Sequence, residues 1–161
     1  MTTLADTQRT LAALVRGDAI PPPTDPYFAA VAASEGLVVT REVIIRWRDL
    51  LVREQCPLTT ALLLRLGRHA PLLNLLGQGE VPLFADELAC AYLALMRDDD
   101  DPLVTAVASY ERALLALLAG AAGPFEITWP CDPEETIGRL ERGETLEGIE
   151  RGEFVTTLAA D

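Results

Sequence analysis

Lysine is absent from this 161-residue sequence, and histidine and cysteine are scarce. The single histidine, His69, and the three widely separated cysteines, Cys56, Cys90 and Cys131, lack the ligand spacing of a zinc site. An odd number of cysteines at such distances also argues against a disulfide framework and favours a reducing compartment. We therefore expect a cytoplasmic protein with no metal site and no cofactor of its own.

Long apolar runs are also missing. No uninterrupted apolar segment reaches the roughly 18 residues that a membrane span needs. The first residues contain no basic group and an early acid, Asp6, which is unlike a secretory signal. Half of all residues are nevertheless hydrophobic, which is enough for a folded chain. The sequence thus predicts a folded protein with no membrane partner.

The net charge of −12 is unevenly distributed. Residues 121–161 hold ten acidic residues and three arginines, and so carry −7 of this charge. All thirteen basic residues of the chain are arginine, and six of them form a basic island in the middle: Arg41, Arg46, Arg48, Arg53, Arg65 and Arg68. A strongly negative chain repels phosphate backbones, which weighs against nucleic acid as a partner.

Capping residues followed by apolar residues at helical spacing predict helices over most of residues 1–120. An extended linker is expected at Pro21–Pro23. In the helix that follows Thr40, Trp47 is expected to lie in a buried stripe with Val43, Ile44, Leu50 and Leu51. The helix that opens at Asp101-Pro102 is expected to be the longest. The expected helices cover residues 4–16, 26–34, 40–54, 57–67, 71–76, 82–96 and 102–119.

The apolar period changes after Gly123-Pro124. Phe125, Ile127 and Trp129 alternate with polar residues, which is typical of a half-buried strand. Asp132-Pro133 then predicts a helix that ends at Gly143, and a second strand is expected over 154–158. We therefore predict a mainly α fold with two parts: a helical body, residues 1–120, and a small strand-helix-strand tail, residues 121–161, packed on the body.

No combination of residues indicates catalysis. A cysteine nucleophile needs a base and an exposed, electropositive setting. Arginines lie on both sides of Cys56 and His69 follows thirteen residues later, but a small residue buried at a helix junction is the favoured interpretation of Cys56. Cys90 is expected in the core. The acidic run Asp98–Asp101 lacks the glycine and distal glutamate of an EF-hand and is interpreted as a solvated loop with a helix cap.

Binding residues are predicted in two places. Arg46, Arg48 and Arg53 are candidates for contact with an acidic peptide or partner surface, with a merely solvated face as the alternative. In the tail, Phe125, Trp129 and Phe154 are expected to be exposed aromatic anchors. The two strands leave an unpaired edge that could accept an extended peptide. Alternatively, the acidic helix 133–142 docks on a basic surface of a partner, or the tail only completes the core.

Several segments, read in order, resemble a bacterial family first described as a DNA-binding domain. The likeness is spread over most of the chain. It rests on Leu4 and Gln8, Arg41 with Ile45-Arg46-Trp47 in place of the family's Ile-Tyr-Arg, Pro57, Leu66-Gly67, Phe84, Leu88-Ala89, Tyr92, Tyr110-Glu111, and Trp129, Pro133, Leu140 and Gly143.

Relatives in that family are partner proteins of the multinuclear non-haem iron-dependent oxidative (MNIO) enzymes, which modify ribosomally made peptides. The resemblance implies a non-catalytic subunit that forms a heterodimer with such an enzyme and presents its precursor peptide, with the iron held by the enzyme. Two other functions remain open: a DNA-binding regulator that uses helices 40–68 in a helix-turn-helix, and an unrelated protein-protein adaptor.

Overall fold

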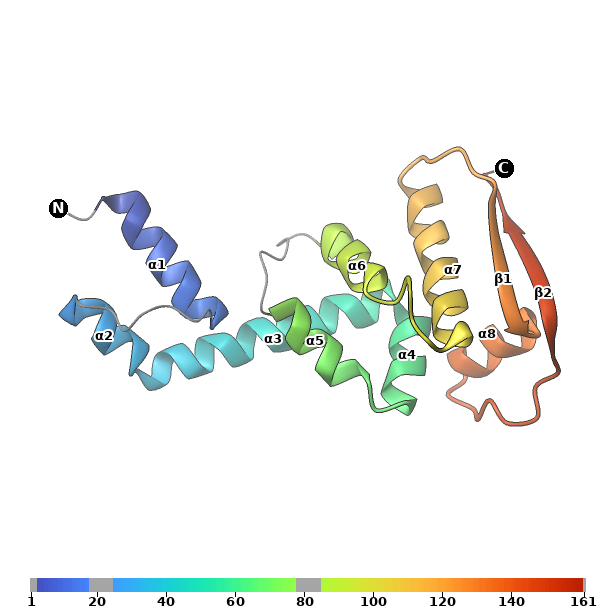
Figure 1. Ribbon diagram of the computed structural model, residues 1–161, viewed down its shortest axis with the longest axis horizontal. Helices are drawn as coiled ribbons and strands as arrows, with labels where there is room; N and C mark the ends of the chain where they lie inside the picture. The colour runs from blue at the N-terminus through green and yellow to red at the C-terminus, as the bar shows by residue number, and fades with distance from the viewer. Residues whose placement is uncertain (1–2, 18–24, 78–84, 161) are drawn as a thin grey trace.

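The computed structural model describes residues 3–17, 25–77 and 85–160. Within these residues the chain is mainly α, with one small antiparallel sheet near the C-terminus, which confirms the predicted fold class (Figure 1). None of the helices described combines the length and the apolar character that a membrane span requires. The elements are α1 (Leu4–Arg16), α2 (Pro26–Ala32), α3 (Glu35–Gln55), α4 (Pro57–Arg65), α5 (His69–Gly77), α6 (Ala85–Ala94), α7 (Pro102–Leu118), β1 (Phe125–Cys131), α8 (Pro133–Glu141) and β2 (Arg151–Leu158).

Three helices begin at an aspartate followed by a proline, as the sequence predicts. Asp25, Asp101 and Asp132 are the N-caps of α2, α7 and α8, and each carboxylate accepts a hydrogen bond from a backbone N–H of the first turn. These bonds satisfy donors that the helix itself leaves unpaired. Thr3 is the N-cap of helix α1, and its side chain forms a capping box with Asp6.

The start of α3 was predicted wrongly. The helix begins at Glu35, because the Ser34 side chain accepts a hydrogen bond from the Leu37 N–H and caps it. Thr40 is an interior residue whose hydroxyl donates to the Gly36 carbonyl. At 21 residues, α3 is longer than the 17-residue α7, so the expected longest helix was also wrong. The predicted linker at 21–23 lies outside the described residues.

One hydrophobic core joins the helices to the C-terminal sheet. Its fully buried members include Val52 of α3, Leu63 of α4, Tyr92 of α6, Val107 of α7 and Trp129 of β1. Because β1 packs on α7, the inner face of the sheet contributes to the same core as the helices.

A second, smaller cluster lies at the other end of the elongated molecule. Leu14, Phe28 and Leu37 pack together there and join α1 and α2 to the first turn of α3. Figure 1 shows α1 and α2 at one end, the sheet and α8 at the other, and α3 running between them.

The sheet has an inner and an outer face. Trp129 pairs with Phe154 and Ile127 with Thr156 on the inner face. On the outer face, Thr128 pairs with Val155, which is exposed. The register shifts between Trp129 and Cys131, so that Cys131 pairs with Arg151 at the start of β2. Each strand has one strand neighbour among the described residues, and the other edge of β2 is unpaired.

Candidate functional site

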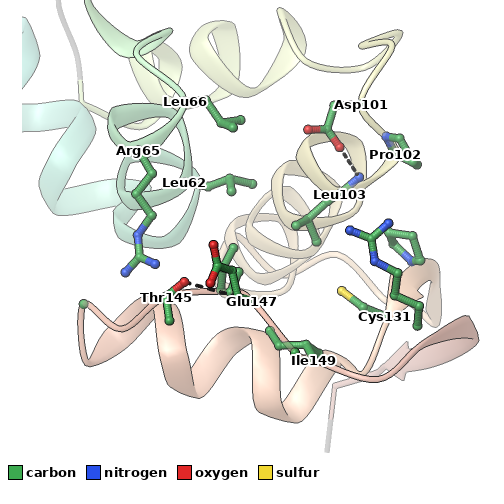
Figure 2. A pocket seen from close by; sticks show the side chains of 15 residues that line it. Leu62, Arg65, Leu66, Asp101, Pro102, Leu103, Cys131, Thr145, Glu147 and Ile149 are labelled. Carbon is green, nitrogen blue, oxygen red and sulfur yellow. Dashed lines mark hydrogen bonds between the residues drawn. The ribbon is translucent and has the colours of Figure 1, made fainter.

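A pocket of about 950 Å³ opens between α4, the first turn of α7, the end of β1 and the loop that leads into β2 (Figure 2). Its apolar lining includes Leu62, Leu66, Leu103 and Ile149. Two arginines and two acids add charge to the lining: Arg65, Arg151, Asp101 and Glu147. An apolar cavity with a few charged groups of both signs suits an apolar side chain whose flanking backbone is polar.

Arg139 of α8 holds the loop that forms one wall of this pocket. Its guanidinium donates to the carbonyls of Thr145 at 3.0 Å and Glu147 at 2.7 Å, and it pairs with the Glu135 carboxylate at 2.5 Å. From the opposite wall, the Arg65 guanidinium donates to the Glu144 carbonyl. The loop is therefore fixed by two arginines, one on α8 and one at the end of α4.

The free edge of β2 begins at the pocket. Arg151 is the first residue of β2 and also lines the pocket. An extended segment that hydrogen-bonds to the β2 edge would therefore have one end beside an apolar cavity. Main-chain hydrogen bonds along a sheet edge supply affinity, and a neighbouring pocket supplies specificity for a side chain.

No family model, no curated protein and no solved structure matches this chain. The family resemblance drawn from the sequence stays a prediction.

The three expected aromatic anchors of the tail are turned toward the protein to different extents. Trp129 is fully buried, and its ring packs edge-on against Tyr110 with centroids 5.7 Å apart. Phe125 and Phe154 are half-buried and pack against the main core. The expectation that Trp129 is exposed was wrong, because the alternation of β1 turns its large side chains toward α7 rather than toward solvent.

The basic island is not one continuous patch. Arg41 donates to the Leu14 carbonyl at the end of α1, at 3.0 Å from Nε, and Arg68 pairs with Asp99. Arg65 is engaged with the pocket loop. These three arginines therefore connect different parts of the fold. The sequence pattern alone does not distinguish such an arginine from one that is exposed to solvent.

The predicted contact arginines all lie on α3 but differ in environment. Arg46 is exposed, and none of the described residues pairs with it. Arg53 donates from Nε to Asp49 at 2.8 Å. Arg48 is half-buried, and this burial lowers its pKa. Only Arg46 and Arg53 are thus placed for contact with another molecule.

Trp47 is exposed, so its predicted place in the core was wrong. It is 58 % exposed, and Val43 and Leu50 on the same side of α3 are exposed to a similar degree. The core-facing side of α3 carries Leu37 and Val52 instead. The sequence pattern identified the apolar stripe but could not show that this helix has a second apolar side that faces the protein.

The cysteines and the histidine do not form a nucleophilic pair. Cys56 is fully buried, as favoured from the sequence, and burial raises the pKa of its thiol. His69 is bonded elsewhere: Nε2 lies 2.6 Å from the Asp49 carboxylate and Nδ1 lies 2.9 Å from the Tyr92 hydroxyl. Cys90 is exposed rather than in the core. No group of three or more potential metal ligands clusters within the described ranges.

Proposed function

We propose that this protein is a non-catalytic partner subunit that binds an extended peptide along β2 and presents it to a separate enzyme. The observation that carries the proposal is the continuity between the unpaired edge of β2 and the pocket at its first residue, Arg151. A sheet edge alone binds any extended chain, whereas an adjoining cavity selects for a side chain.

The partner enzyme is proposed from the resemblance to the MNIO family and from the charge of the tail. Residues 121–161 carry −7 of the net charge, and Glu134 and Glu135 lie in the first turn of α8. Such a surface suits a basic face of an enzyme, and complementary charge chiefly accelerates encounter. In this proposal the iron belongs to the enzyme, which forms a heterodimer with this chain, and the peptide is its ribosomally made precursor.

Location in the cytoplasm is part of the same proposal. None of the three cysteines forms a disulfide, and one of them, Cys90, is exposed. Free exposed thiols are typical of a reducing compartment.

Helix-turn-helix DNA binding is less well supported by the same surfaces. In α4, which would be the recognition helix, Leu58, Thr59, Thr60, Leu62 and Leu63 are all buried. A recognition helix must expose several side chains to base edges. A protein-protein adaptor without a peptide substrate remains the second candidate, because the exposed apolar side of α3 favours protein contact.

The proposal predicts that an iron oxidase and a short precursor peptide are encoded beside the gene of this chain, and the test uses the full chain with these two partners. We expect the three to co-purify, and Leu66→Arg to weaken the binding of fluorescently labelled peptide at least about tenfold by occupying the pocket. Leu64→Arg is the matched control, since Leu64 and Leu66 are 45 % and 43 % exposed but only Leu66 lines the pocket.

Adjacent proline substitutions test the strand edge. Backbone N–H groups of neighbouring strand residues point to opposite edges, so one of Val155→Pro and Thr156→Pro removes a ladder bond to β1 and the other removes only an outward donor. The variant that keeps the thermal stability of the native protein should lose peptide binding. If that variant and Leu66→Arg both bind peptide normally, the site is elsewhere and the proposal fails.

A further inference from the structure

The exposed side of α3 carries a continuous apolar stripe. Val39, Val43, Trp47 and Leu50 are spaced by four, four and three residues, which places them on one side of the helix. Each is more than half exposed. The opposite side of α3 packs on α1 through Leu37 and on the main core through Val52. A contiguous apolar stripe on a protein surface is suited to contact with another molecule.

Charged residues along one border of the stripe alternate in sign. Beyond the first turn, which carries Glu35, they are Glu42, Arg46, Asp49 and Arg53. At 100° per residue, these four lie within a narrow sector beside the apolar stripe. Arg46 is exposed with no ion-pair partner among the described residues, and Arg53 uses only Nε for Asp49, so that its terminal nitrogens are available.

This alternation is complementary to itself when two copies of the helix run antiparallel. In an isologous contact each border faces the same border of the other copy. A two-fold axis that passes midway between positions 47 and 48 sets Glu42 opposite Arg53 of the second copy. The same axis sets Arg46 opposite Asp49 of the second copy. One placement thus sets each of the four charges opposite a charge of the other sign on the second copy, and brings the two Trp47 side chains together at the centre.

The distribution of charge over the whole chain permits this contact despite the net charge of −12. Helix α3 holds four arginines and four acids and is neutral. The acidic tail lies beyond the C-terminal end of α3 (Figure 1). In an antiparallel pair the C-terminal ends of the two helices point in opposite directions, so the two tails are far apart. Charges separated by more than about 8 Å are largely screened at physiological ionic strength.

We propose that this protein forms a two-fold symmetric homodimer through antiparallel pairing of α3, with Trp47 at its centre. This proposal is independent of the peptide site, because neither β2 nor the pocket contributes to it, and each copy in the homodimer keeps its own tail for one enzyme chain. A central tryptophan enclosed by apolar neighbours and bordered by ion pairs has the anatomy of a binding hot spot.

Sedimentation equilibrium of the full chain tests the dimer. The native protein should be dimeric at tens of micromolar, and Trp47→Glu should be monomeric at the same concentration, with unchanged circular dichroism because Trp47 is not in the core. Leu118→Glu is the control, since Leu118 is exposed on α7 and lies outside the proposed interface. A monomeric native protein, or a dimer that survives Trp47→Glu, overturns the proposal.

Charge reversal tests the antiparallel register. Glu42→Arg alone and Arg53→Glu alone each place like charges opposite one another twice, and each should weaken the dimer about tenfold or more. In a mixture of the two single variants, a heterodimer sets opposite charges against each other at both of these places, so dimerisation should be regained. If mixing brings no recovery, the register is wrong. If the native protein stays monomeric and Trp47 becomes protected only on binding the enzyme, the stripe is an enzyme contact and the dimer is excluded.

Discussion

The carboxylate of Glu111 in α7 caps the N-terminus of α4 by accepting a hydrogen bond from the backbone N–H of Leu58 at 2.7 Å, across 53 residues of sequence. Its second oxygen accepts from the Thr59 N–H at 2.9 Å. The N-cap position of α4 is Cys56, which makes no side-chain capping bond. Glu111, which comes from a distant helix, therefore caps the N-terminus of α4. Other helices of the chain are capped by an adjacent serine or aspartate.

Loss of this long-range cap should be costly. Glu111→Ala leaves two buried N–H groups without an acceptor, and we expect the free energy of unfolding to fall by about 2–4 kcal/mol. Urea titration measures this loss. Glu126→Ala, at an exposed position of β1, should change stability by less than about 0.5 kcal/mol. Equal effects of the two substitutions would mean that the Glu111 cap contributes nothing.

The Glu111 carboxyl should also make stability depend on pH. Burial raises its pKa above the ordinary value of 4.5, more than its hydrogen bonds to Thr59 and Leu58 lower it. The folded protein then binds more protons than the unfolded chain, so this contribution is present below pH 4.5 and is lost as pH rises through the folded pKa. The stability advantage of the native protein over Glu111→Gln should accordingly shrink as pH rises. If the advantage grew with pH instead, the hydrogen bonds from the Leu58 and Thr59 N–H groups would lower the pKa of Glu111 more than burial raises it.

The two tryptophans should respond oppositely to truncation. Trp129→Ala removes a fully buried side chain from the junction of sheet and α7, and should cost about 3–5 kcal/mol. Trp47→Ala removes an exposed side chain and, measured at a concentration where the protein is monomeric, should cost less than about 1 kcal/mol. Denaturant titrations followed by circular dichroism give both values. A large loss at Trp47 would place that residue in a core after all.

Thiol alkylation should distinguish the three cysteines. Cys90 is exposed, and iodoacetamide should label it in the native protein. Cys56 and Cys131 are buried, and burial raises the pKa of Cys56 so that little reactive thiolate forms. Mass spectrometry should find these two modified only after denaturation. Rapid labelling of native Cys56 would contradict its position in the core.

The wall of the pocket should depend on Arg139. Arg139→Ala removes the donors to the Thr145 and Glu147 carbonyls, and backbone amides of residues 144–149 should then exchange with solvent faster by about tenfold or more. Hydrogen-exchange mass spectrometry reads this directly. Arg9→Ala is a suitable control, because its ion pair with Asp6 lies in the exposed first turns of α1, far along the chain from the loop. Unchanged exchange would mean that Arg65 alone holds the loop.

Local signals in the sequence were sufficient for most helix starts. Each Asp-Pro pair places a cap acceptor before a residue whose φ is already helical, and α2, α7 and α8 begin there. The period-two pattern likewise predicted β1. At α3, however, the helix was predicted to begin only after Thr40. It begins one residue before Gly36, and in the first turn a glycine interrupts few helical hydrogen bonds. The stronger local cap, Ser34, decided the outcome.

The candidate site was less accessible to prediction because it depends on which side of an element meets the rest of the chain. Periodicity placed Trp47 and Trp129 on apolar stripes, yet one stripe faces solvent and the other faces α7. The pocket combines residues of α4, α7 and the 143–151 loop, which no short-range pattern relates. The Glu111 cap was missed for the same reason, since its partners are more than fifty residues away.

The small cluster of Leu14, Phe28 and Leu37 shares no residue with the main core. Cooperative unfolding requires that the loss of one part expose apolar surface in the other, and here α1 and α2 make their main contacts with each other and with α3. We therefore expect the N-terminal helices to form a separate foldon that opens at lower free energy than the rest of the molecule. A protease that cleaves only unfolded chain would remove these two helices first and leave the α4–β2 core intact.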